Sequence, residues 1–473
     1  MRILWIFFCK APVLLAVIIA SLSLFSCDSI VIESDPAPTI EIHSGYNVQL
    51  AASSSGQWRS DNPSVATVSA TGLVTAVSAG KATIYTYSSS SDQQIVCYLE
   101  VNPRRNILFF IATDDNISSI DNDTPVKISR IQKGWKPEQG ELLIYMDRKG
   151  QGASLLQINN TLTDGFYGVD TLEVYGPQNS ADPEIMKGII NKVVSENPAD
   201  SWGMIFFSHA SGWLPEGMLN DPRSSAVDHP AEQFDAGKAD LNVSPRSLVI
   251  DNGHGSSQEM KYADFASAIQ NNQFDFIIFE ACLMADVLVM YELRNKADYV
   301  MASSAEIVAP GFTSIYAGSV MGLFNTSKSV DEVLMEFASA YSRHYDTSFT
   351  MSILKMSEMN ALAAVTKSVL KGKLIHESNL TIGAIQTFYK VRSSRKWSFF
   401  DLEQTIEELV SESDYRTFCN QIEKTVIWKD ESNRTLYFPI SRHCGLTTYI
   451  EQAAYPQLNA AFENSSWYNA IKP

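Results

Sequence analysis

The first pattern along the chain is a series of mainly apolar runs, which predict buried strands. The runs lie at residues 106–112, 141–147, 202–208 and 274–279. A strand that is apolar at every position is expected where helices cover both faces of a sheet. Residues 182–196 carry apolar side chains at helical spacing, with Ile185, Ile189, Ile190 and Val193 on one side. Strands that alternate with helices predict an α/β domain with a mainly parallel sheet.

Residues 248–251 predict one further strand of this sheet, and residues 262–270 predict the helix that follows it. The strand that ends at Phe279 is followed by Glu280, Ala281 and Cys282, and then by a helical pattern over residues 283–294. In open α/β sheets, ligands bind at the carboxyl ends of the strands. The sequence therefore places Glu280 and Cys282 where a site is expected.

A different pattern precedes residue 103 and predicts a separate domain. Residues 39–102 contain short runs with alternating apolar and polar positions, broken by Ser, Gly, Asn and Pro. The runs lie at residues 48–50, 65–68, 73–77 and 82–85. Even spacing of such runs predicts a small antiparallel sandwich. The segment 58–84 resembles the group 2 bacterial immunoglobulin-like domain, which implies a spacer module and leaves an adhesive role as an alternative.

The N-terminus has the form of an export signal. Residues 1–26 combine Arg2 and Lys10 with an apolar run from Ala11 to Phe25, as secretory signals do. The run ends in Leu24-Phe25-Ser26-Cys27, which resembles the lipobox of bacterial lipoproteins and implies lipidation of Cys27. An ordinary signal peptide or a membrane anchor is the alternative. Residues 27–38 are polar, contain two prolines and predict a tether.

Charge and cysteine content narrow the function classes. The net charge of −17 argues against a nucleic-acid partner, because phosphate binding needs a basic face. The 473 residues predict two or more domains. The six cysteines show no CxxC pair and no metal-ligand spacing, so they predict neither a disulfide framework nor a zinc site. A pair between Cys419 and Cys444 is left open.

The candidate chemistry is a cysteine nucleophile with a histidine base. His209 directly follows the predicted strand at 202–208, and Cys282 comes three residues after the end of the predicted strand at 274–279. A histidine on an adjacent parallel strand can serve as the base or charge partner of a thiol. The predicted helix after Cys282 would also favour a thiolate, because the positive end of a helix stabilises negative charge. A buried structural cysteine is the alternative.

Around His209 and Cys282 the chain resembles the clostripain family of cysteine peptidases, which has a caspase-like α/β/α sandwich fold. The resemblance covers about residues 105–473. It rests on residues 106–116, 208–213, 280–284, 297–303, Glu306, 310–311 and 444–468.

The resemblance implies a His209/Cys282 dyad that cleaves peptide bonds through a thioester. It also implies an oxyanion hole formed by the backbone N–H groups of Ala210 and Cys282. Glu280 would receive a basic side chain before the scissile bond, with Glu306 and Asp114 also in the substrate site. The chain departs from the family at Glu280, where Asp is usual, and at Ala210 and Ala285, where Gly is usual.

Other residues compete for these roles. His254 also follows a strand, but His209 is preferred because the family has no fixed histidine at the position of His254. His443 is predicted to be structural or exposed. Three interpretations are open for the polar residues after the first strand, Asp114, Asp115 and Asn116. They could line the pocket, bind calcium or form a polar turn at the strand end.

The long segment 214–247 is rich in Pro, Gly, Asp and Ser. So long a loop in a compact domain is usually functional or cleaved. The resemblance implies that the precursor is cut here, with Arg223 as the preferred site and Lys238 and Arg246 as alternatives.

Together these features predict an exported, lipid-anchored bacterial cysteine endopeptidase with a leader (1–26), a tether (27–38), an immunoglobulin-like domain (39–102) and a peptidase domain (105–473). Its partners would be protein or peptide substrates and, through the lipid, a membrane at the cell surface or in the periplasm. No cofactor is required, and calcium binding is left open. The alternative is an inactive surface lipoprotein of the same fold that binds or adheres.

Overall fold

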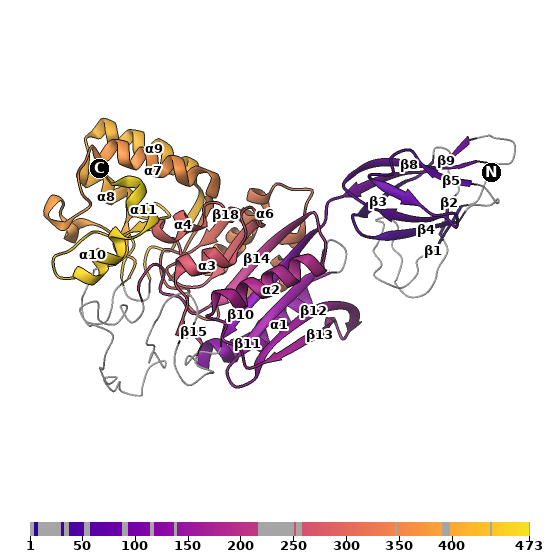
Figure 1. Cartoon of the computed structure of the whole chain (residues 1–473), viewed down its shortest axis with the longest axis horizontal. Helices are drawn as coiled ribbons and strands as arrows, with labels where there is room; N and C mark the ends of the chain where they lie inside the picture. The colour runs from indigo at the N-terminus through magenta and orange to yellow at the C-terminus, as the bar shows by residue number, and fades with distance from the viewer. Residues whose placement is uncertain are drawn as a thin grey trace.

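The structure is a computed structural model of the whole chain (Figure 1). It describes residues 4–7, 30–32, 37–51, 57–87, 93–113, 118–136, 140–215, 250–251, 258–345, 348–389, 398–435 and 438–472. The predicted lipidation site Cys27, the pocket candidate Asp114, the rival His254 and the processing candidates Arg223, Lys238 and Arg246 lie outside the described residues.

The N-terminal domain consists of two small sheets that pack face to face. Their orders are β2-β1-β4-β7-β6 and β3-β9-β8-β5. The strands are β1 (Leu4–Phe7), β2 (Ile30–Ile32), β3 (Thr39–His43), β4 (Asn47–Ala51), β5 (Gln57–Ser60), β6 (Ala66–Val68), β7 (Leu73–Ala76), β8 (Gly80–Tyr87) and β9 (Gln93–Asn102). Alternating residues such as Ile40, Ile42, Val48 and Leu50 form the core. The predicted sandwich is antiparallel except at β3 and β9, which pair in parallel.

The second domain is built on a sheet of nine strands in the order β13-β12-β11-β10-β14-β17-β18-β19-β21. The strands are β10 (Arg105–Thr113), β11 (Leu142–Arg148), β12 (Gly152–Thr163), β13 (Phe166–Gly176), β14 (Ser201–Ser208), β17 (Phe274–Glu280), β18 (Ala297–Ala302), β19 (Thr350–Lys355) and β21 (Val426–Glu431). The five central strands are parallel. The two strands at each edge are antiparallel.

Helices cover both faces of this sheet. One face packs against α1 (Ser118–Gly134), α5 (Thr313–Ser319), η1 (Val320–Phe324) and α6 (Val330–His344). The other packs against α2 (Pro183–Glu196), α3 (Tyr262–Ala268), α4 (Val287–Leu293), α7 (Met359–Leu370), α8 (Leu402–Leu409), α9 (Glu412–Thr425), α10 (Pro456–Glu463) and α11 (Ser466–Ile471). Separate apolar clusters fill the two interfaces. The predicted α/β/α sandwich is therefore confirmed.

The short elements around this framework are the single-turn helices η2 (Met356–Glu358), η3 (Glu377–Asn379) and η4 (Ile382–Ala384), and the strands β20 (Phe400–Asp401) and β22 (Thr447–Thr448), which pair with each other. Strand β15 (Ile250–Asp251) pairs with β16 (Gln258–Glu259) in a small sheet of its own. The prediction that residues 248–251 form a strand of the main sheet is therefore wrong for the two residues that the structure describes.

The two domains meet at the amino ends of the central parallel strands. Only Pro103 and Arg104 separate β9 from β10. The Asp200 carboxylate accepts hydrogen bonds from the Arg104 N–H, at 2.7 Å, and from the Ser44 hydroxyl. The Arg104 guanidinium also lies 5.3 Å from the Tyr46 ring centre. Figure 1 shows the N-terminal domain at one end of an elongated molecule, with α7 to α11 at the other.

Candidate active site

The strand register brings His209 and Cys282 together. Strands β14 and β17 are parallel neighbours, and Phe207 pairs with Glu280. His209 and Cys282 each follow their paired residue by two positions, so they leave the sheet at the same level and toward the same face. Neighbouring strands lie about 4.8 Å apart, which places both side chains at one small pocket. That pocket is lined by His209, Cys282, Glu280, Asp123 and the loop at 307–311.

The Cys282 thiol is partly buried and is held by the loop that follows β18. The Ile307 N–H donates to Sγ at 3.3 Å. Burial and the Glu306 carboxylate raise the pKa of Cys282 to about 12, although the Ile307 N–H opposes this shift. Helix α4 begins only at Val287, after a cap by Asp286, so Cys282 is not next to a helix N-terminus. The predicted helix stabilisation of a thiolate is therefore wrong.

We expect Cys282 to react slowly with iodoacetamide in the free protein. A thiol whose pKa is about 12 carries little thiolate at pH 8, so alkylation should be at least about tenfold slower than for free cysteine. The rate should still be rising at pH 10. Mass spectrometry of the alkylated peptide measures this, with the partly exposed Cys419 as an internal control. Fast alkylation that levels off near pH 7 would contradict the expectation.

His209 is also held as a neutral group. Its side chain is 8% exposed, and burial lowers its pKa to about 4. The Nε2 atom is buried and has no hydrogen-bond partner among the described residues. A neutral imidazole with an unpaired nitrogen beside a neutral thiol can accept the thiol proton. The arrangement favours a general base over a preformed ion pair.

The backbone around the two residues is closely packed. Leu283, directly after Cys282, has a φ of 62°, a conformation that non-glycine residues adopt only when their surroundings enforce it. Gly212 has a φ of 63°, and a Cβ there would clash with the Leu283 carbonyl oxygen. Ala210 is not among the described residues with positive φ, so the departure from Gly at this position causes no such strain. The two turns are thus in direct contact.

The backbone N–H groups of Ala210 and Cys282 donate no hydrogen bond to any residue that the structure describes. Unpaired N–H groups beside a nucleophile are the donors that an oxyanion hole requires. Their role in that hole remains a prediction that this geometry suits.

The predicted substrate carboxylates differ in their surroundings. Glu280 is buried and forms an ion pair of 2.6 Å with Lys127 of α1. Burial raises the Glu280 pKa, and Lys127 opposes the shift. Glu306 is half-buried, and burial raises its pKa to about 7. Asp123 lines the pocket, and Lys127 is the ion-pair partner of Glu280. Neither was predicted from the sequence, because both are polar residues of a helix for which no apolar pattern was identified.

His443 forms polar contacts with Ser304, in the loop after β18 that also contacts the Cys282 sulfur, and with Glu431. Ser304 Oγ lies 3.1 Å from His443 Nε2, and Glu431 Oε2 lies 3.0 Å from His443 Nδ1. His443 is buried, which confirms the structural alternative for this residue. Ser304 is fully buried, so this Ser–His–Glu arrangement is closed to a substrate.

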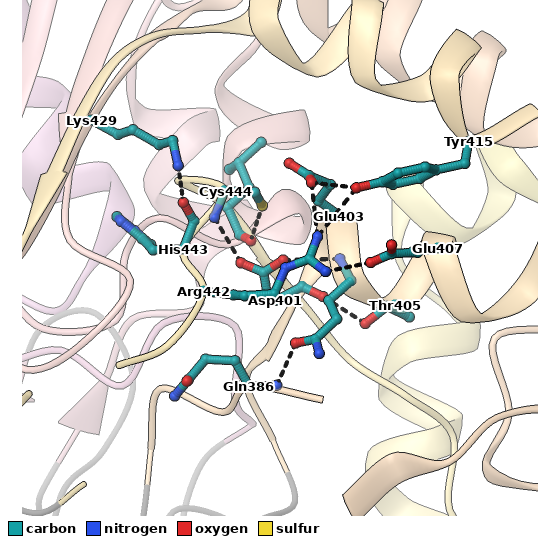
Figure 2. Close-up of polar contacts among 12 residues, drawn as sticks. Gln386, Asp401, Glu403, Thr405, Glu407, Tyr415, Lys429, Arg442, His443 and Cys444 are labelled. Atoms are coloured by element: carbon teal, nitrogen blue, oxygen red, sulfur yellow. Dashed lines mark hydrogen bonds and ion pairs between the residues drawn. The ribbon is translucent and has the colours of Figure 1, made fainter. Parts of the chain in front are cut away.

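Arg442 and Cys444, the neighbours of His443 in the sequence, form hydrogen bonds with residues in and next to α8. Figure 2 shows Arg442 between Glu403 and Glu407, with Tyr415 donating to Glu403 at 2.7 Å. The Cys444 N–H donates to Asp401 at 2.7 Å (Figure 2). Cys419 and Cys444 are both free thiols, so the disulfide that the sequence left open is absent from this structure.

The part of the chain that the structure describes contains no candidate metal site and no candidate membrane-spanning helix. Among those residues, no group of three or more His, Cys, Asp or Glu side chains could hold a metal ion. The calcium alternative at Asp114, Asp115 and Asn116 lies outside them. Within the same residues, no helix has the length and apolar character to cross a bilayer.

A central parallel sheet between two helix layers, with histidine and cysteine at the carboxyl ends of adjacent strands, defines the class of caspase-like peptidase folds. The clostripain family model matches residues 232–453, and the model of the group 2 bacterial immunoglobulin-like domain matches residues 42–97. Both resemblances expected from the sequence are therefore confirmed. Cys282 lies within the matched region, whereas His209 precedes it. The comparison with curated proteins returned no match.

Solved structures give the same result over a longer stretch. An inactive zymogen of a C11 protease from Parabacteroides distasonis is 27% identical, covers 79% of this chain and 99% of its own, and has a TM-score of 0.64. A secreted C11 cysteine protease from Bacteroides thetaiotaomicron, in complex with an irreversible peptide inhibitor, is 25% identical, with coverages of 78% and 99% and a TM-score of 0.62. The second domain thus resembles the clostripain (C11) cysteine proteases in sequence over residues 232–453 and in fold over most of its length.

Proposed function

We propose that the protein is a cysteine endopeptidase whose nucleophile is Cys282 and whose base is His209. The main support for the proposal is that His209 and Cys282 line the same pocket. Both follow adjacent parallel strands by the same number of residues, because Phe207 pairs with Glu280. The unpaired Nε2 of His209 supports the assignment of the base. Similarity to a C11 protease with a bound peptide inhibitor supports the substrate class.

The proposed reaction proceeds through a thioester. His209 takes the thiol proton as Sγ attacks the carbonyl carbon, and the oxyanion is met by the N–H groups of Ala210 and Cys282. The C–N bond breaks as His209 gives that proton to the leaving amine. His209 then activates a water that hydrolyses the thioester and restores the thiol.

Cleavage after Arg or Lys is part of the proposal. The pocket is lined by the carboxylate residues Asp123 and Glu280, and Glu306 lies beside the sulfur. The ammonium of Lys127 balances one of these charges. A partly desolvated acidic pocket favours a basic side chain through charge-assisted hydrogen bonds.

The proposal has three further parts. The protein is exported and lipid-anchored through Cys27, its precursor is cut at Arg223, and the immunoglobulin-like domain acts as a spacer. They are supported by the residue patterns of the leader and of the segment 214–247 and, for export, by the secreted C11 relative. Gel analysis of the mature protein and labelling with a radioactive fatty acid test the anchor, with Cys27→Ser as the matched control.

Covalent labelling tests the assignment of the nucleophile. We expect an irreversible peptide inhibitor with Lys or Arg at its reactive end to add to Cys282 in a one-to-one ratio, because binding aligns the electrophile with Sγ. Intact-mass and peptide-mass analysis locate the adduct. The free thiols Cys97, Cys419 and Cys444 are internal controls. An adduct at one of these, or none at all, would favour the alternative of a binding protein that lacks peptidase activity.

A further inference from the structure

We propose that Lys127 determines the specificity of this pocket: it binds the Glu280 carboxylate internally and leaves Asp123 as the carboxylate that receives a basic substrate side chain. The inference rests on the proposed peptidase function and deepens it. It reassigns the residue that the resemblance implied, Glu280, from a receptor for substrate to a part of the pocket wall.

The Glu280 carboxylate already accepts three hydrogen bonds from the protein. Its Oε1 accepts from Lys127 Nζ at 2.6 Å and from the Phe312 N–H at 2.6 Å. Its Oε2 accepts from the Tyr316 hydroxyl at 2.8 Å. Only 1% of the side chain is exposed. A carboxylate with three buried donors has little capacity left for a substrate cation.

The loop before α5 also covers Glu280. Gly311 has a φ of 59°, and a Cβ at this position would clash with Glu280 Oε1. The backbone at Pro310 and Gly311 therefore packs directly on the carboxylate and forms part of the pocket lining. A substrate side chain would have to move this loop to reach Glu280.

Lys127 cannot easily yield its place to a substrate. Its side chain is fully buried, and Nζ donates to Thr313 Oγ1 at 2.6 Å as well as to Glu280. The ammonium also lies 4.2 Å from the centre of the Phe207 ring. If a substrate Arg or Lys took over Glu280, the buried Lys127 charge would lose its nearer carboxylate, at 2.6 Å, and keep only Asp123 at 3.5 Å, which is unfavourable.

Asp123 lies one helical turn before Lys127, and its side chain is more exposed to solvent than that of Glu280. Its side chain is 17% exposed and its Oδ2 is 3.5 Å from Lys127 Nζ. The Thr313 hydroxyl donates to the same oxygen at 2.6 Å. Asp123 lines the pocket, and two carboxylates against one ammonium leave one negative charge there. A basic side chain would neutralise it at Asp123.

The decisive measurement is a ratio of kcat/KM values for coumarin peptides that differ only in having Arg or norleucine before the scissile bond. The full chain is used. We expect Asp123→Asn to lower the Arg:norleucine ratio by about 30-fold or more, because a charged hydrogen-bonded partner is lost. Glu280→Gln should leave the ratio within about threefold of the wild-type value. Asp121→Asn is the matched control, because Asp121 lies on the same helix but binds Arg148.

A collapse of the ratio in Glu280→Gln, with no change in Asp123→Asn, would overturn the inference. A second measurement does not need activity and so separates this inference from the proposed function. Lys127→Met should lower the unfolding temperature, whereas the double variant Lys127→Met/Glu280→Gln should recover at least about half of the loss. The exposed Lys133 of α1 supplies the control Lys133→Met. Additive effects of Lys127→Met and Glu280→Gln would overturn the internal pair even if no peptide is cleaved.

Discussion

Replacement of Cys282 by alanine is expected to lower kcat/KM for Arg- and Lys-coumarin peptides by about ten-thousand-fold or more, because no other group can form the thioester. The side chain is partly buried, and among the described residues its Sγ forms hydrogen bonds only with the Ile307 backbone. Its loss should therefore change stability little. Initial rates with the full chain measure the effect, and Cys419→Ala, which removes a partly exposed thiol on α9, is the matched control.

The same variant tests the proposed processing in the segment 214–247. Wild-type protein should appear as two fragments on a denaturing gel, whereas Cys282→Ala should stay whole. Hydrolysis that persists in Cys282→Ala would rule out the thioester mechanism, and identical fragments in both proteins would rule out cleavage by the enzyme itself.

Replacement of His209 by alanine should lower kcat by about a thousandfold, because general base catalysis is lost while the thiol remains. The pH profile carries additional information. Burial lowers the pKa of His209 to about 4, so the imidazole stays neutral and able to accept a proton well below pH 6.5. The acid limb of kcat, measured at saturating substrate, should consequently lie near pH 4 to 5, with kcat retained as the pH falls from 7 to 5.

Rate measurements between pH 3.5 and 8 decide this point. The exposed His344 at the end of α6 supplies the control variant His344→Ala, which should keep both the rate and the profile of the wild type. An acid limb at pH 6.5 or above would mean that the imidazole is solvated or paired with a thiolate in the active enzyme.

The parts of the fold that sequence predicts well are those fixed by burial alone. Strands β10, β11, β14 and β17 are covered on both faces, so each consists mainly of apolar residues. Their carboxyl ends then place His209 and Cys282 without further information. The hairpin β12 and β13 was not predicted, because β13 lies at the sheet edge and none of its residues is fully buried, which leaves no clear apolar pattern.

The parts that sequence could not predict depend on contacts between distant segments. Lys127 meets Glu280 across 153 positions of the chain, and Ile307 meets the Cys282 sulfur across 25. No local pattern encodes either contact. The late start of α4 is a partial exception, because Asp286, whose side chain accepts from the Leu288 N–H, is a typical N-cap residue that the helical pattern over residues 283–294 obscured.

The short connection between the domains has a consequence for the targets that the proposed peptidase could reach. The N-terminal domain joins the amino ends of the parallel strands, and Arg104, Asp200 and Ser44 fasten it there. The pocket opens at the opposite ends, across a strand of nine residues that spans about 30 Å. In the proposed membrane-anchored peptidase, the immunoglobulin-like domain would lie between the anchor and the pocket. Such a peptidase would favour targets that extend well above the membrane over targets that lie close to it.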